Sequence, residues 1–283
     1  MFDRDLPPEL LPGFAQEIEA LGADDLWVVE DLGWTGAISA AATALAATSG
    51  IRVCIGITPA PLRNPVLLAM ELANLARLYP GRLAAGIGHG VQDWMRQAGA
   101  AAVSPLSLLD ETVSVVRALL RGETVTAHGR EVKVDGVRLV HPPKIIPVIL
   151  TGVLKPRSLA LSGRIAQGTI VPEGFGPAEI AAALDHIAAD DHELVVITHL
   201  RTDTDPAQAR ATALPVIEGQ AQWLGVAPEH YQMACGTPAD AVEFARSLAA
   251  AGASTIVFRP IGPNPVEQVR SVIGPRAFAG PET

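Results

Sequence analysis

Several side chains suited to acid–base chemistry stand at the ends of short apolar runs. Glu30 and Asp31 come at the end of one such run, and His89 lies between two glycines after another. Carboxylates and imidazoles transfer protons in many enzymes, and an unperturbed imidazole titrates near neutral pH. We therefore treat these three as candidate catalytic residues. A salt bridge to Arg201 or Arg259, or a structural role for the histidine, would explain them without catalysis.

A phosphate-bearing ligand has a candidate site further along the chain. Thr151 and Gly152 end an apolar run, and Lys155 and Arg157 stand at the start of the helix that the pattern predicts next. Free N–H groups at the beginning of a helix, together with nearby cations, suit a phosphate. A solvated helix face is the alternative explanation for the two cations.

The predicted elements that must position these residues alternate between strand and helix. Strand-like runs lie near residues 1–3, 25–30, 51–58, 82–87, 146–151, 165–171, 193–200 and 254–259. Six helices begin at a proline that follows a turn or capping residue, where the missing N–H costs little. These prolines are Pro65, Pro105, Pro177, Pro206, Pro238 and Pro265. Eight strand–helix units favour an α/β fold, a (β/α)8 TIM barrel, with an open doubly wound sheet as the alternative.

Three parts of the chain depart from this alternation. The run at residues 1–3 is short for a barrel strand, so either the strand is short or the chain begins inside it, and we favour the second. Residues 122–143 predict a β-hairpin excursion between the fourth helix and the fifth strand. Residues 222–236 form a second, irregular excursion. We treat residues 1–283 as one barrel domain with these two excursions.

A parallel barrel places its active site at the carboxyl ends of its strands. By this rule Thr58 joins the candidate ligand contacts, and Trp34, Trp94, Glu173 and His199 become candidate substrate-pocket residues. Trp94 fits the hydrophobic core equally well. A slip of one residue in strand register would turn His199 outward.

The overall composition excludes several classes of protein. The 283 residues are 49% hydrophobic, which suits one large α/β domain. The net charge of −9 argues against general binding of nucleic acid or anionic membrane. Two cysteines give neither a disulfide framework nor the spacing of a metal site, so we expect no metal. Without a signal peptide or an apolar spanning run, the sequence predicts a soluble cytoplasmic protein.

The ordered motifs between residues 52 and 90 resemble a known family. They comprise a strand ending GITP, a helix opening RNP, the connection LARLYPGRL and the glycine turn GIGHG. This set is similar to the luciferase-like monooxygenase superfamily, and within it to the branch that depends on coenzyme F420. The resemblance implies a (β/α)8 oxidoreductase that transfers a hydride between the deazaflavin ring and a small organic substrate.

The resemblance also implies roles for individual residues. In this family the third strand carries a bulge with a non-prolyl cis peptide behind the ring, and the matching bond joins Gly56 to Ile57. The implied cofactor contacts are Gly56, Ile57, Thr58, Gly88, Gly90, Thr151, Gly152, Lys155 and Arg157. Relatives often end the second strand with an acid and a histidine, whereas here Asp31 follows Glu30. His89 is the residue that could replace the missing base.

Two other functions stay open at this point. FMN also carries a phosphate, so an FMN-dependent monooxygenase of the same superfamily fits the same motifs. The absent histidine leaves room for a non-catalytic protein that holds a cofactor or ligand. The expected partner is a small-molecule substrate, and the resemblance implies a homodimer paired through outer helices.

Overall fold

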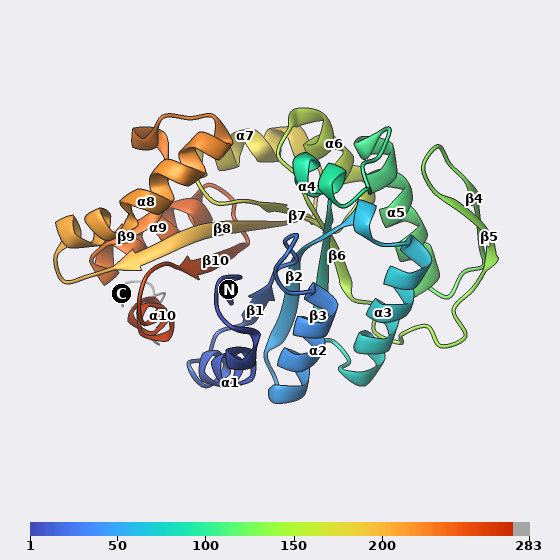
Figure 1. Ribbon diagram of the computed structural model, residues 1–283, viewed down its shortest axis with the longest axis horizontal. Coiled ribbons are helices and arrows are strands. Elements are labelled where there is room, and N and C mark those ends of the chain that lie inside the picture. Colours follow the sequence, from blue (N-terminus) through green and yellow to red (C-terminus); the bar gives the residue numbers. More distant parts are fainter. Residues whose placement is uncertain (274–283) are drawn as a thin grey trace.

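The computed structural model describes residues 1–273 and forms a curled parallel β-sheet with helices around its outer face (Figure 1). In spatial order the strands are β1 (Asp25–Val28), β2 (Arg52–Pro59), β3 (Leu83–Gly88), β6 (Val148–Gly152), β7 (Gly168–Val171), β8 (Glu193–Thr202) and β10 (Thr255–Pro260). The short strand β9 (Ala234–Gly236) pairs with the carboxyl end of β8. The predicted α/β barrel class is therefore confirmed.

Six of the helices in residues 1–273 begin where the proline pattern predicts. The helices are α1 (Leu11–Ala20), α2 (Ala37–Ala47), α3 (Pro65–Leu78), α4 (Gln92–Gln97), α5 (Pro105–Leu120), α6 (Pro156–Ile165), α7 (Pro177–Ile187), α8 (Pro206–Leu224), α9 (Pro238–Ala250) and α10 (Pro265–Val272). Three short 3-10 helices, η1 (Pro8–Leu10), η2 (Ala60–Leu62) and η3 (Pro228–His230), complete the set. All six predicted proline starts are confirmed. At α3, for example, the Asn64 side chain accepts a hydrogen bond from the Val66 N–H, which satisfies one of the free donors of the first turn.

The predicted first strand is not formed. Residues 1–3 have no strand assignment, but the amino group of Met1 donates to the carbonyl of Phe258 at 2.8 Å. The N–H of Phe2 donates to the carbonyl of Trp27 at 2.9 Å. Because these acceptors lie on β10 and β1, two residues bridge the two edges of the curled sheet without a regular ladder.

The predicted hairpin is confirmed as β4 (Val125–His128) paired antiparallel with β5 (Lys133–Val137), and it lies outside α5 (Figure 1). The Glu111 carboxylate of α5 holds its turn by accepting hydrogen bonds from the N–H groups of Arg130, Glu131 and Val132 at 2.7–2.9 Å. The second excursion is more regular than predicted. It contains the end of α8, then η3, and then β9, whose three residues are too few to give a strand pattern in the sequence.

The interior of the curled sheet is a packed hydrophobic core. It is filled by Trp27, Cys54, Ala84, Leu150, Ile170, Val195, Ile197 and Val257, with at least one residue from each strand of the main sheet except β9. At the amino end of the strands, Arg52 pairs with Asp25 at 2.7 Å and with Glu193 at 3.2 Å. These contacts fill the amino end and the centre, so the residues available for ligands are those at the carboxyl ends.

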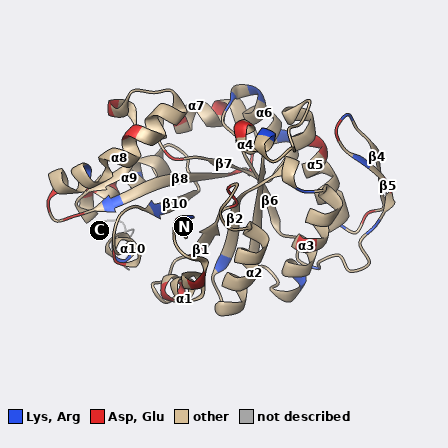
Figure 2. Ribbon diagram, viewed as in Figure 1, with Lys and Arg blue, Asp and Glu red and all other residues tan. Residues whose placement is uncertain are grey.

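Charged side chains are dispersed over the fold, with acidic and basic residues on the same elements (Figure 2). Among the helices of residues 1–273, none combines the length and the hydrophobicity that a membrane-spanning segment needs.

Candidate active site

The carboxyl ends of the sheet strands, with the segments that follow them, are called the mouth below. Seven of the predicted site residues lie here in three separate clusters of polar contacts, and the others lie outside these clusters. Within residues 1–273, no group of three or more His, Cys, Asp and Glu side chains could hold a metal ion.

The first cluster surrounds Glu30. The hydroxyl of Thr58 donates to one carboxylate oxygen at 2.7 Å, and Nη2 of Arg63 donates to the other at 2.6 Å. Arg63 also bonds Glu71 at 3.1 Å. Burial lowers the pKa of Arg63, but its hydrogen bonding to Glu30 and the charges of Glu30 and Glu71 together outweigh burial and raise the pKa overall. The salt bridge considered from the sequence is therefore present at Glu30, with Arg63 as the partner instead of Arg201 or Arg259.

The second cluster joins Asp31 to the two tryptophans. Nη1 of Arg4 donates to the Asp31 carboxylate at 2.6 Å. The guanidinium carbon of Arg4 lies 4.4 Å from the centre of the Trp34 ring and 6.0 Å from that of Trp94. The two indole rings are themselves 6.0 Å apart. A guanidinium over an aromatic face is attracted by the ring electrons, so Arg4 links the predicted acid to the predicted pocket aromatics.

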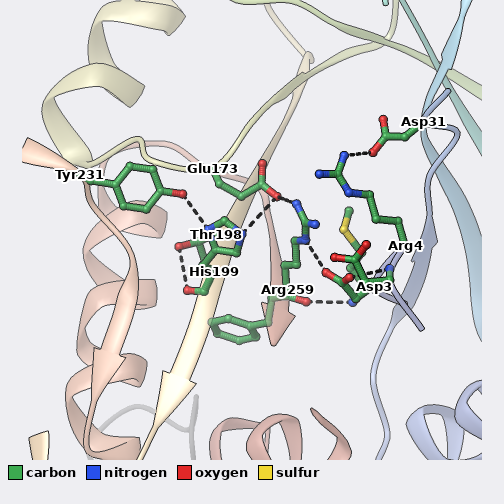
Figure 3. Close-up of polar contacts among 11 residues, drawn as sticks. Asp3, Arg4, Asp31, Glu173, Thr198, His199, Tyr231 and Arg259 are labelled. Atoms are coloured by element: carbon green, nitrogen blue, oxygen red, sulfur yellow. Dashed lines mark hydrogen bonds and ion pairs between the residues drawn. The ribbon is translucent and has the colours of Figure 1, made fainter. Parts of the chain in front are cut away.

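The third cluster is a chain of polar contacts that crosses the mouth from β8 to the amino-terminal segment (Figure 3). Nδ1 of His199 lies 2.7 Å from the Tyr231 hydroxyl, and its Nε2 lies 3.9 Å from Oε1 of Glu173. Nη1 of Arg259 donates to the same Glu173 oxygen at 2.8 Å, and its Nε donates to Asp3 at 2.7 Å. The side chain of His199 therefore points toward the mouth, which is the orientation that the predicted strand register requires.

The protonation states in this third cluster follow from its burial. Burial lowers the pKa of His199 to about 4, so the imidazole is neutral at pH 7. Burial raises the pKa of Glu173, but the Arg259 charge, together with the other contacts of the carboxylate, outweighs burial and lowers the pKa overall. Burial also raises the pKa of Tyr231. An ionised carboxylate only accepts, so we assign the imidazole proton to Nε2, facing Glu173, with the Tyr231 hydroxyl donating to Nδ1.

His89 is separate from these clusters. Its Nδ1 lies 3.2 Å from the carbonyl oxygen of Pro105, which can only accept, so this nitrogen carries the proton. Burial lowers the pKa of His89, which keeps the ring neutral and leaves Nε2 as its acceptor. Within residues 1–273, no hydrogen bond joins His89 to Glu30 or Asp31.

The glycines at the strand ends leave room for the side chain of Ile57. The peptide bond between Gly56 and Ile57 is cis, as the family resemblance implies. A Cβ atom added at Gly152 would lie 2.5 Å from Cγ2 of Ile57, and one added at Gly88 would lie 2.9 Å from its Cδ1. Two of the glycines implied as cofactor contacts, Gly88 and Gly152, are therefore covered by the half-buried side chain of Ile57. Gly90 has a φ of +67° and packs against Met95, so it also serves the fold.

The structure separates the remaining predicted ligand contacts. The hydroxyl of Thr151 is fully buried and donates to Ser162 of α6, because alternate side chains of β6 point into the helix layer. Thr151 can therefore offer a ligand only its main chain, and Thr58 is likewise buried and bonded to Glu30. Lys155 and Arg157 are exposed at the first turn of α6, as predicted.

A groove of about 490 Å³ lies at the rim beside the first cluster, between η2, residues 99–102, α5 and the start of β5. Arg63 lines it, but none of the residues predicted as site residues from the sequence does so. The groove and the clustered side chains are therefore adjacent rather than coincident.

Sequence reasoning missed four members of the clusters, which are Arg4, Arg63, Glu71 and Tyr231. Arg4 and Arg63 lie in turns whose local pattern gives no sign of a charged partner. Tyr231 is one of only two tyrosines in the chain, and its rarity is the single signal that could have drawn attention to it.

Comparison with known proteins decides the family. Residues 7–270 match the model of the luciferase-like monooxygenase family. The chain belongs to this family. Within it, the chain is 26% identical over 212 residues to the 5,10-methylenetetrahydromethanopterin reductase of Methanolobus tindarius, covering 72% of this chain and 65% of the relative.

Two further similarities extend the comparison. The F420-dependent glucose-6-phosphate dehydrogenase of Nakamurella multipartita is 29% identical over 157 residues, covering 52% of this chain and 42% of the relative. This luciferase-like protein thus matches less than two thirds of the length of each of these two curated relatives. The structure of the coenzyme F420-dependent tetrahydromethanopterin reductase from Methanopyrus kandleri superposes with a TM-score of 0.84 at 19% identity, covering 95% of each chain, which establishes the shared fold.

Proposed function

We propose that this luciferase-like protein is an oxidoreductase that transfers a hydride between coenzyme F420 and a small organic substrate. The observation that carries the proposal is the arrangement at the mouth. Half-buried Ile57 covers Gly88 and Gly152, and the exposed cations Lys155 and Arg157 open the helix that follows β6. Similarity to relatives whose names include F420-dependent activity supports the choice of cofactor.

The residues present fit this cofactor, which combines a flat ring, a phosphodiester and an acidic tail. Ile57 offers an apolar surface for the ring. Lys155 makes no side-chain capping bond at the start of α6, so the first N–H groups of the helix are available to an anion. Lys155 and Arg157 would add two positive charges at this point in a chain of net charge −9.

When bound, the deazaflavin supplies the redox chemistry by taking up or giving a hydride at its C5. The protein must then hold or move the substrate's proton. Glu30 and Asp31 are each bound to an arginine at 2.6 Å, so both carboxylates already have a charged hydrogen-bond partner. His89 is neutral, with Nε2 as its acceptor. We therefore assign proton transfer to His89 among the three predicted candidates.

FMN is the alternative cofactor, because the phosphate site at α6 fits it equally well. An FMN-dependent monooxygenase is accordingly the second candidate function. A protein that binds a cofactor without turnover is the third.

The first experiment is a tryptophan-fluorescence titration with coenzyme F420, run beside an identical titration with FMN. Trp34 and Trp94 at the mouth provide the signal. We expect saturable quenching by F420 and none by FMN. Quenching by FMN alone would move the protein to the monooxygenase function, and quenching by neither in a folded protein would refute both.

Variants test the assigned contacts. Lys155→Ala and Arg157→Ala should each weaken F420 binding about tenfold, the value of one lost charge-assisted hydrogen bond. Arg164→Ala removes an exposed cation from the last turn of the same helix and should leave binding unchanged. Equal effects at all three positions would show a general charge effect instead of a phosphate site.

We also propose that the protein acts as a homodimer in the cytoplasm on a small-molecule substrate. Size-exclusion chromatography with light scattering measures the oligomeric state, and a monomer at micromolar concentration would contradict the dimer.

A further inference from the structure

We propose that the mouth selects substrates that carry no anionic group, because carboxylates already bind the guanidinium groups of Arg4, Arg63 and Arg259, and Lys155 and Arg157 are assigned to the cofactor. The inference rests on the proposed function, in that the mouth must be the substrate site. It concerns the chemical class of the substrate, which the cofactor by itself leaves open.

The ion pairs at the mouth are close and partly buried. They are Arg4 with Asp31 at 2.6 Å, Arg63 with Glu30 at 2.6 Å and Glu71 at 3.1 Å, and Arg259 with Asp3 at 2.7 Å and Glu173 at 2.8 Å. The side chains of Arg63 and Arg259 are only 17% and 14% exposed. A phosphate or carboxylate on the substrate would have to displace a protein carboxylate from one of these arginines, leaving that carboxylate without its cation.

Arg201, two residues beyond His199 on β8, does not supply a free cation to the mouth. It is 8% exposed, its Nη2 lies 3.5 Å from Asp203, and a Cβ atom added at Gly262 would lie 3.3 Å from its Nη1. The segment after β10 therefore lies against its guanidinium group.

The balance of charges in these ion pairs also disfavours an anionic substrate. Four carboxylates (Asp3, Glu30, Asp31 and Glu173) face three guanidinium groups (Arg4, Arg63 and Arg259) in these pairs, even before Glu71 is counted. The imidazoles of His89 and His199 add no positive charge at neutral pH, since burial lowers the pKa of each. An anionic substrate would therefore enter a region of net negative charge, which repels it.

The apolar side chains of the mouth suit a neutral molecule. Trp34 is 44% exposed, and Trp94 and Ile57 are half-buried. The similar dehydrogenase from Nakamurella multipartita is named for a phosphorylated sugar. Under this inference, the substrate of this chain carries no phosphate and so differs from the one for which that relative is named.

Glucose and glucose-6-phosphate form a matched pair that differs only in the phosphate. Their binding to the F420-loaded protein is measured by isothermal titration calorimetry. For the natural sequence we expect glucose-6-phosphate to bind no more tightly than glucose. The double variant Asp3→Asn, Glu173→Gln frees the Arg259 guanidinium, and we expect it to bind glucose-6-phosphate at least about tenfold more tightly than glucose.

A matched control removes two carboxylates elsewhere. The double variant Glu123→Gln, Glu267→Gln takes charge from two exposed pairs, with Arg121 and with Arg270. It should behave like the natural sequence. A gain equal to that of the mouth variant would mean that overall charge, and not the freed arginine, sets the preference.

Three outcomes would overturn the inference. They are tighter binding of glucose-6-phosphate than of glucose to the natural sequence, no gain in the mouth variant, or an equal gain in the control. If the mouth variant does not fold, Asp3→Asn alone replaces it, and the measurement on the natural sequence decides in any case. The preceding F420 titration separates the two proposals, because a protein that binds no F420 contradicts the function before the sugars are tested.

Discussion

Acidification should destabilise this protein through the buried imidazole of His199. This side chain is 1% exposed, and burial lowers its pKa to about 4. In the unfolded chain a histidine titrates near 6.5. Below that pH the unfolded state therefore binds more protons than the folded state, and stability falls as the pH falls. The loss from this residue reaches about 2 kcal/mol at pH 5 and approaches about 3 kcal/mol near pH 4.

The side chains that neighbour His199 do not titrate between pH 6.5 and pH 5. Glu173 and Asp3 have a lowered pKa overall, even though burial by itself raises it, so their contribution is lost only at lower pH. Arg259 and Tyr231 keep their protons throughout, because the pKa of each is raised. Between pH 6.5 and pH 5 the imidazole is thus the titrating side chain of this cluster. Burial also lowers the pKa of the Met1 amino group to about 5, and comparison with a variant at position 199 cancels that contribution.

The assay compares urea unfolding, followed by circular dichroism, at pH 7.5 and at pH 5. The variant His199→Asn keeps an acceptor close to the position of Nδ1 but cannot titrate, so its loss of stability should be about 2 kcal/mol smaller than that of the natural sequence. The control His128→Asn removes an exposed histidine of the hairpin and should leave the loss unchanged. Equal losses in the His199 variant and the natural sequence would refute the assignment of a buried neutral imidazole.

Three further predictions concern the mouth. Arg63→Gln leaves the Glu30 carboxylate without its cation and should lower the free energy of unfolding by about 3 kcal/mol, and a second change, Glu30→Gln, should restore most of it in a denaturant titration. Gly152→Ala places a methyl group 2.5 Å from Ile57 and should cost about 1–3 kcal/mol by thermal unfolding. Adding Ile57→Ala should relieve that specific clash, and no relief would show that the clash lies elsewhere. His89→Ala should lower turnover more than F420 affinity, and unchanged turnover would remove His89 from proton transfer.

The order and type of the elements were predictable because their signals are local. A proline in the first helical turn follows from its own ring and missing N–H, and each of the six predicted starts lies at such a residue. The strand β9 and the bridging role of Phe2 were not predictable in this way. Both depend on pairing with strands far along the chain, and neither segment is long enough to show a periodic pattern.

The candidate site was likewise predictable from local signals only in part. The sequence by itself indicated that Glu30, Asp31, Glu173 and His199 lie at the carboxyl ends of parallel strands, since that follows from strand order. Their partners were decided only by the curl and register of the sheet. The pair between Asp3 and Arg259 joins residues 256 positions apart, and that between Arg4 and Asp31 joins residues 27 apart. Charge pairing depends on distance in space, which the closing of the sheet fixes, and so only the tertiary structure reveals which carboxylates are bound and which groups stay free for chemistry.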